Sequence, residues 1–169
     1  METIEAIHTR RSVRAYTDKK VEPEKIHKML AAAMTAPSAG NQQPWQFLVI
    51  DDKGILAEIP DMHPYASMAK HAAGAIIVLG DAKLERLKGF WVQDCAAATQ
   101  NMLLAAHTQG IGAVWCGIYP DENRVKKFRE HFQVPATVTP LSMVVFGYPD
   151  EPPKREDRYR EDRVHHNKW

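Results

Sequence analysis

The chain has 169 residues, 44% of them hydrophobic, which is typical of one globular domain with an ordinary buried core. Its 22 basic and 21 acidic residues give a formal net charge of +1, which excludes a global field that attracts nucleic acid or an anionic membrane, so any anion site must be local. No apolar run approaches the roughly 20 residues that span a bilayer, and no export signal opens the sequence. We therefore expect a single cytoplasmic domain over residues 1–169.

The sequence of the first part of the chain, up to residue 54, predicts two helices and a strand. Thr3 is placed to cap a short helix that ends near the first arginines. A longer helix is expected over residues 23–35, where a proline fits the first turn and apolar residues recur at helical spacing. Residues 45–50 are aromatic and branched, which predicts a strand, and the polar residues 51–54 are expected to form a break after it.

The second part of the chain predicts three more strands and two more helices. Residues 74–80 are apolar on both faces and are expected to form a central strand. An alanine-rich helix is expected between residues 90 and 110, buried on more than one side. Residues 110–118 predict a turn and a strand, residues 120–130 a helix, and residues 141–148 a last strand. Because helices and strands alternate without internal repeats, the sequence predicts a layered α+β fold.

After residue 149 the composition changes to prolines and charged residues without apolar periodicity. Such a segment is either disordered or wraps a partner. We treat residues 150–169 as a C-terminal extension of the same domain, and we note that this polar segment ends in Trp169.

Three arginines, Arg10, Arg11 and Arg14, lie within five positions around Ser12. Like charges this close repel one another unless an anion or carboxylates compensate them. A guanidinium offers two parallel donors to phosphate oxygens, and a serine hydroxyl adds a third. The cluster therefore predicts a phosphate site, and the alternative is a solvated basic loop that pairs with nearby glutamates.

A second polar motif runs from Pro37 to Trp45, between the second helix and the first strand. Gly40 allows the backbone to approach a flat ligand closely. The amide side chains of residues 41–43 supply donors and acceptors that match a ring with alternating carbonyl and N–H groups. The alternative is an ordinary loop in which asparagine and glycine form turns.

Other signals in the sequence point to structure rather than chemistry. Cys95 and Cys116 have apolar neighbours and are expected to be reduced, buried thiols. The histidines form no metal-binding pattern with cysteines or carboxylates, so we expect no metal site. Residues 110–115 begin like a dinucleotide fingerprint but lack the third glycine and follow a helix, so we reject it. Asp94 is expected to be a capping or interface residue rather than a catalytic acid.

Taken together, the motifs at residues 10–14 and 36–45 resemble the nitroreductase family of flavin enzymes. The resemblance continues at residues 91–101, 110–117 and 164–169 and so covers essentially the whole chain. It implies a three-layer α/β/α fold with a mixed, mostly antiparallel central sheet. It also implies a homodimer with two FMN molecules at the subunit interface, each contacted by both chains, and a C-terminal extension that wraps the partner.

The resemblance also implies FMN contacts for fourteen residues in four segments. These are Arg10, Arg11, Ser12, Arg14, Pro37, Ser38, Ala39, Asn41, Gln43, Trp115, Cys116, Gly117, Arg155 and Arg158. The first two segments divide between subunits, because residues 37–43 would border the ring system of the partner's flavin, with Asn41 and Gln43 as hydrogen-bonding side chains. Of the basic residues in the C-terminal extension, Arg155 would reach the phosphate, with Arg158 as the second candidate.

Within one subunit the implied roles are more specific. Arg10 and Ser12 would bind the phosphate and ribityl chain, Arg11 would contribute through its backbone, and Arg14 would face the flavin pyrimidine. A cation there stabilises the negative charge of reduced flavin and raises its potential. Residues 115–117 would pass beneath the isoalloxazine with backbone N–H groups near N5, although core packing explains the side chains of Trp115 and Cys116 equally well.

The activity that the resemblance implies is an FMN-dependent oxidoreductase. NADH or NADPH would give hydride to the flavin and leave, and an acceptor such as a nitroaromatic or a quinone would then take the electrons. No side chain has to act as a nucleophile. The alternative is a flavin-binding redox sensor or reservoir without significant turnover.

Overall fold

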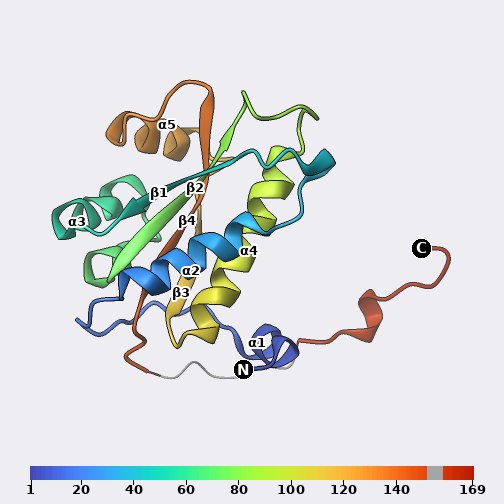
Figure 1. Cartoon of the computed structure of the whole chain (residues 1–169), viewed down its shortest axis with the longest axis horizontal. Helices are drawn as coiled ribbons and strands as arrows, with labels where there is room; N and C mark the ends of the chain where they lie inside the picture. The colour runs from blue at the N-terminus through green and yellow to red at the C-terminus, as the bar shows by residue number, and fades with distance from the viewer. Residues whose placement is uncertain (152–157) are drawn as a thin grey trace.

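Four strands form one sheet, and helices cover both of its faces (Figure 1). The computed structural model describes residues 1–151 and 158–169. The strands are β1 Trp45–Ile50, β2 Gly74–Asp81, β3 Gly112–Gly117 and β4 Val138–Gly147. The α-helices are α1 Thr3–Thr9, α2 Pro23–Met34, α3 Lys53–Met62, α4 Trp91–Thr108 and α5 Glu122–His131. Short 3-10 turns are η1 Ala39–Asn41, η2 Ser67–His71 and η3 Glu161–Arg163.

The strand order in the sheet is β1-β2-β4-β3, and each neighbouring pair is antiparallel. One isolated parallel bridge joins Ser12 to Ala113 of β3, at the edge of the sheet. These pairings confirm the expected antiparallel character of the sheet, and its four strands contain no parallel pair, since the one parallel contact among the described residues is this isolated bridge. The bridge also holds the arginine segment next to β3, although Ser12 and Ala113 are about a hundred positions apart in the sequence.

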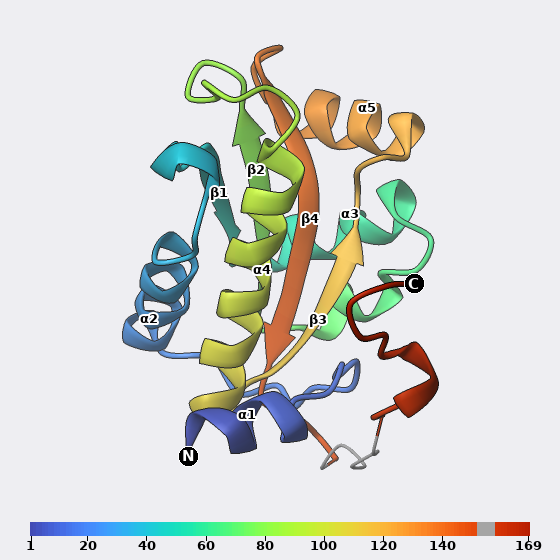
Figure 2. The same ribbon diagram turned by 90° about the vertical axis from the view of Figure 1, so that its right-hand side faces the viewer.

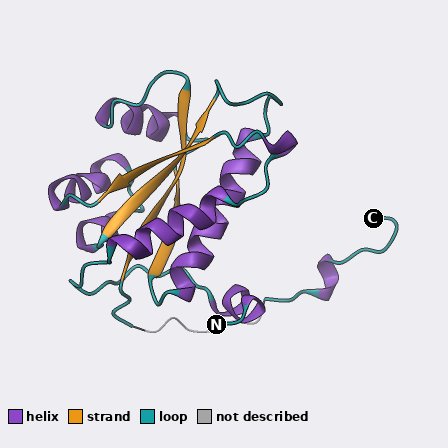
Figure 3. Ribbon diagram, in the orientation of Figure 1, coloured by secondary structure: helices purple, strands orange, loops and turns teal. Residues whose placement is uncertain are grey.

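The sheet separates two hydrophobic cores, because successive residues of a strand point to opposite faces. On β2, Ile76 and Val78 pack with α2 and α4, whereas Ile77 and Leu79 pack with α3 and α5. All four side chains are buried, which explains why this strand is apolar on both faces. The helices flank the strands on two sides (Figure 3), and α4 lies along the sheet with α2 beside it (Figure 2). The predicted three-layer architecture is confirmed.

Helix α3 is the element that the sequence prediction missed. The polar residues expected to form a break instead start the helix, because the Asp52 side chain accepts a hydrogen bond from Ile55 N at 3.0 Å and caps it. Leu56, Ile59 and Met62 are buried along one side. The helix also contains a proline, Pro60, which obscures the helical pattern.

Two other predicted boundaries differ from the structure. Thr3 is the first helical residue of α1 rather than its cap, and the capping position is held by Glu2 without a side-chain hydrogen bond. Strand β4 begins at Val138, three residues earlier than expected, because its first residues extend the pairing with β2 across a register shift near Val78. The bounds of α2, β1 and β2 agree with the prediction to within about one residue.

The C-terminal residues 158–169 extend away from the sheet (Figure 1), and Trp169 is fully exposed in the single chain. That this extension wraps a partner subunit stays a prediction. Among the described residues we find no helix with the length and apolar character that crossing a bilayer requires.

Candidate functional site

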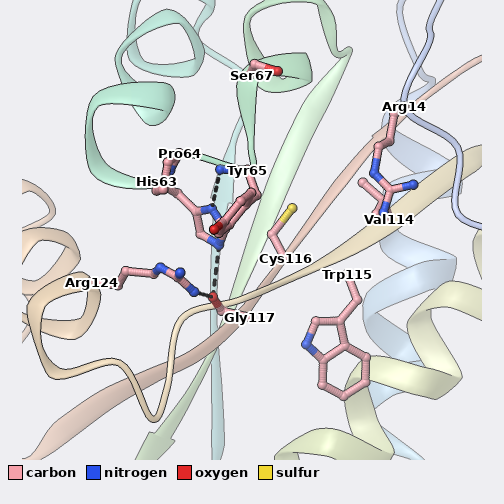
Figure 4. Close-up of a pocket in the computed structure, with 10 residues that line it drawn as sticks. All are labelled: Arg14, His63, Pro64, Tyr65, Ser67, Val114, Trp115, Cys116, Gly117 and Arg124. Atoms are coloured by element: carbon pink, nitrogen blue, oxygen red, sulfur yellow. Dashed lines mark hydrogen bonds between the residues drawn. The ribbon is translucent and has the colours of Figure 1, made fainter.

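A cavity of about 570 Å³ lies where the arginine segment, β3 and the chain after α3 meet (Figure 4). It is lined by Arg14, His63, Pro64, Tyr65, Ser67, Val114, Trp115, Cys116, Gly117 and Arg124. Two of the segments singled out in the sequence, around Arg14 and at residues 115–117, therefore meet at one cavity. The other lining residues come from the chain after α3 and from α5, which the sequence analysis did not single out.

Arg14 is positioned at the cavity by the backbone on either side of it. Val13 N donates to Ala113 O at 3.0 Å, and the Tyr16 hydroxyl donates to Val13 O at 2.6 Å. The fit requires a glycine on β3, because a Cβ on Gly112 would lie 2.7 Å from a methyl group of Val13. Arg14 itself is exposed and makes no hydrogen bond or ion pair with any residue that the structure describes.

Arg10 and Arg11 lie in a region of positive charge. Burial, together with the charges of Arg11 and Arg158, lowers the pKa of Arg10. Arg11 Nη1 donates to the carbonyl oxygens of His8 at 2.9 Å and Arg10 at 2.7 Å. Within the described ranges Arg10 has no carboxylate partner, which favours a phosphate site over a glutamate-paired loop. Arg155, the other predicted phosphate contact in the extension, lies outside the described residues.

His107 adjoins this positive region, and sequence reasoning did not single it out. Thr9 Oγ1 donates to Glu5 O at 2.7 Å, so its oxygen accepts the 2.8 Å hydrogen bond from His107 Nε2. The pKa of His107 is lowered, chiefly by burial and then by the charges of Arg10 and Arg11. The ring is therefore held neutral at pH 7 beside the arginine cluster.

The Pro37–Trp45 loop is held by a buried polar network. The carboxyl group of Asp94, near the start of α4, accepts hydrogen bonds from Ala39 N at 2.9 Å and Gln42 Nε2 at 2.7 Å. The Gln42 side-chain oxygen in turn accepts from Arg86 N and Leu87 N, each at 2.9 Å. Asp94 is therefore not the cap of α4, one of the two roles that we expected, but a buried group that positions this loop, and its place at a subunit interface stays a prediction.

The outer side of the same loop is exposed and has an unusual backbone. Asn41 and Gln43 have φ angles of 51° and 48°, a left-handed conformation that residues other than glycine seldom adopt. Gln43 Nε2 donates to Asn41 Oδ1 at 2.9 Å, and Gln43 N donates to Ser38 Oγ at 3.0 Å. None of the loop residues lines the cavity of the same chain. Their assignment to the flavin of a partner subunit stays a prediction.

A pair of donors from two other elements holds the end of β3. His63 is buried, and its Nδ1 accepts a hydrogen bond from Tyr65 N at 3.3 Å, so Nε2 carries the proton and donates to Gly117 O at 2.9 Å. Arg124 Nη1 donates to the same carbonyl oxygen at 3.1 Å (Figure 4). Burial is the main cause that lowers the pKa of His63. The Gly117 carbonyl thus has two donors that fix the backbone facing the cavity.

The side chains of the neighbouring β3 residues point to opposite faces of the sheet. Trp115 is 36% exposed, whereas Cys116 is 5% exposed and belongs to the core shared with α3 and α5. Burial raises the pKa of Cys116 to about 11, so it is a thiol at neutral pH. Both Cys95 and Cys116 are buried and unbridged, as predicted.

Comparisons with known proteins agree with this geometry. The profile described as "Nitroreductase family" matches residues 7–92 and 62–148. The "Putative NADH dehydrogenase/NAD(P)H nitroreductase" of Methanothermobacter thermautotrophicus is 50% identical over 169 residues, which is 100% of this chain and 88% of that protein. An FMN-dependent nitroreductase from Clostridium difficile R20291 has 31% identity and a TM-score of 0.89, covering 98% of this chain and 99% of its own.

A crystal structure from Desulfovibrio desulfuricans, described as "a putative nitroreductase in complex with fmn", has a TM-score of 0.84 and 31% identity, covering 100% of this chain and 98% of its own. The match of the family profile extends over most of the chain, and the 50% identical relative covers all of it. The chain belongs to the nitroreductase family.

Proposed function

We propose that this chain is an FMN-dependent oxidoreductase that passes electrons from NADH or NADPH to an acceptor such as a nitroaromatic or a quinone. The observation that carries the proposal is Arg14, a cation with no hydrogen bond or ion pair among the described residues, at a cavity of about 570 Å³. Beside it lies the backbone of Trp115–Gly117. Similar proteins described as FMN-dependent, or in complex with FMN, support this cofactor.

The described residues offer the charges and donors that FMN requires. Arg10, Arg11 and Ser12 offer donors for a phosphate, and Arg10 has no carboxylate partner among the residues described. Arg14 and residues 115–117 would border the ring. When bound, FMN supplies the hydride chemistry, taking two electrons from a nicotinamide and passing two to an acceptor.

The protein's own contribution is positioning and electrostatics. The guanidinium of Arg14 would favour the negatively charged, reduced form of the ring. His63 and Arg124 hold the Gly117 carbonyl, which keeps the neighbouring N–H groups in place without rearrangement during the reaction. The balanced reaction consumes one NAD(P)H, one proton and one acceptor, and it yields NAD(P)⁺ and an acceptor reduced by two electrons. Donor and acceptor would use the same face in turn.

A homodimer completes the proposed site. The Pro37–Trp45 loop is held by two hydrogen bonds to Asp94 and lines no part of the cavity of its own chain, so it is free to border the cavity of a second chain. The extension at residues 158–169 ends in a fully exposed Trp169, which a partner surface would bury. Sedimentation analysis of the purified protein tests this part of the proposal.

The absorbance spectrum of the purified protein tests the cofactor, and anaerobic titration with NADH and with NADPH tests the donor. We expect a yellow protein whose flavin absorbance is bleached by at least one nicotinamide and restored by nitroaromatics or quinones. A colourless protein without affinity for added FMN would overturn the proposal. Reduction of bound FMN that is too slow to support any plausible turnover would instead indicate a flavin reservoir or sensor.

A further inference from the structure

The cavity is cationic although the chain as a whole is nearly neutral. Its lining includes two guanidinium groups, Arg14 and Arg124, and none of the described lining residues is an aspartate or a glutamate. In Figure 4 the two arginines lie on opposite sides of Cys116. Under the proposed function Arg14 faces the flavin ring, which leaves Arg124 without an assigned ligand.

The Arg124 side chain is held on three sides. Asp121 caps α5 by accepting a hydrogen bond from Arg124 N at 3.0 Å, and its carboxylate lies 3.4 Å from Arg124 Nε. Arg124 Nη1 donates to Gly117 O at 3.1 Å, and the ring of Tyr65 is 5.5 Å from Cζ. A guanidinium already fixed in this way loses little side-chain freedom when it binds an anion.

The remaining donors and charge of Arg124 are available at the cavity. The side chain is 24% exposed, and its Nη2 makes no hydrogen bond with any part of the chain that the structure describes. Asp121 is itself 43% exposed, and a solvent-exposed ion pair of this kind compensates a charge only weakly. His63, the other titratable group on the Gly117 carbonyl, is held neutral by burial. Positive charge therefore remains on this side of the cavity.

Arg124 also contacts the backbone that the proposed function places beneath the reactive flavin atom. We propose that Arg124 binds an anionic group of the electron acceptor, so that the enzyme prefers carboxylate-bearing aromatic acceptors to neutral acceptors of the same shape. The inference rests on the proposed function, because it assigns the acceptor to the same cavity. It adds the chemical class of that acceptor, a planar aromatic anion.

Benzoate and benzamide test the inference by equilibrium binding, because they share a planar shape and differ in charge. Isothermal titration calorimetry on the purified full chain measures both, with or without flavin reduction. We expect benzoate to bind more tightly than benzamide, and Arg124→Gln to weaken benzoate binding about ten- to a hundredfold, as expected for hydrogen bonds to a charged group. The dissociation constant for benzamide should change less than about threefold, which is well below the effect of losing one hydrogen bond to a charged group.

Lys126→Gln is the matched control, since Lys126 lies on the same helix, is 73% exposed and carries the same charge. It should leave both affinities unchanged. Kinetics with 4-nitrobenzoate and 4-nitrobenzamide should show the same pattern in kcat/KM, with a larger loss for the carboxylate than for the amide in Arg124→Gln and no loss for either in Lys126→Gln. Equal losses of benzoate affinity in Arg124→Gln and Lys126→Gln would indicate a general effect of charge and would overturn the inference.

Three further results would also overturn it. Wild-type protein that binds benzamide as tightly as benzoate has no anion preference. Equal weakening of benzoate and benzamide by Arg124→Gln would mean that Arg124 only shapes the cavity through Gly117. Slower reduction of bound FMN by the nicotinamides in Arg124→Gln, with unchanged benzoate binding, would mean that Arg124 binds an anionic group of the electron donor instead. If the protein holds no FMN, the proposed function fails, and calorimetry still decides whether Arg124 selects anions.

Discussion

The loop around Asp94 and the segment around Arg10 and Arg14 are both polar, yet they differ in where their partners lie. Every hydrogen bond of the Asp94–Gln42 network ends within the chain, and both side chains are buried. Arg10 and Arg14 have no carboxylate partner among the residues described. A buried polar group with internal partners stabilises the fold, whereas charges left without partners indicate a ligand from outside the chain.

The largest effect is expected when the internal network is broken. Asp94→Ala leaves the partly buried Ala39 N and the buried Gln42 amide without this acceptor, and each such loss costs free energy. We expect the free energy of unfolding to fall by about 3 kcal/mol, measured by urea denaturation. Glu130→Ala, an exposed carboxylate on α5, is the control and should change it little. A small effect of Asp94→Ala would show that the two polar regions do not differ in this way.

The opposite outcome is expected for the arginine segment. Arg10→Ala removes a charge that Arg11 and Arg158 repel, so the protein without FMN should be as stable as wild type. Its dissociation constant for FMN should rise about ten- to a hundredfold, because donors to a phosphate are lost. Fluorescence titration with FMN measures this change. Arg160→Ala, whose side chain pairs with Asp162 in the C-terminal extension, is the matched control.

The arginine segment was more predictable from the sequence than the Asp94–Gln42 network. Uncompensated charge is visible in the sequence itself, as in residues 10–14, and the family resemblance added residues 115–117, which do share a cavity with Arg14. The partners of Asp94 could not be predicted, because Gln42 lies 52 positions away and no local pattern joins them. Asn41 and Gln43 bond each other within this chain, and their contact with the flavin of a partner subunit stays a prediction.

His63 escaped prediction for a different reason. It follows α3, and the polar residues that cap that helix resemble a break between elements. With α3 missing, nothing in the sequence placed His63 or Tyr65 beside β3. The fold was more predictable than this part of the site, since the spacing of apolar residues in β1, β2 and α2 indicates directly which positions are buried.

A smaller effect separates the roles of Arg10 and Arg14. Arg14→Ala removes the cation expected at the flavin pyrimidine, and we expect the two-electron midpoint potential of bound FMN to fall by about 30 mV, equivalent to a tenfold change in equilibrium. Anaerobic redox titration against a reference dye measures the potential. Arg10→Ala should leave the potential nearly unchanged. If both variants changed affinity and potential equally, the division of roles would be wrong.

The smallest effect concerns His63, which belongs with Asp94 because its partners are internal. Burial lowers the pKa of His63 in the folded protein, whereas an unfolded chain titrates histidine near about 6.5. Between these two pKa values the unfolded chain binds more protons, so the free energy of unfolding rises with pH. The stability that the neutral ring contributes is complete above about pH 6.5 and is lost as the pH falls below it.

His63→Gln should flatten this rise, because glutamine can still donate to Gly117 O but does not titrate. Urea denaturation of both proteins from about pH 5 to about pH 8 measures the two slopes, and the pKa of His107, lowered in the same direction, contributes equally to both. Parallel curves would mean that His63 titrates alike in the folded and unfolded chains. The Gly117 carbonyl would then be held mainly by Arg124. His63 would no longer belong with Asp94 but with Arg10 and Arg14, whose partners are expected outside the chain.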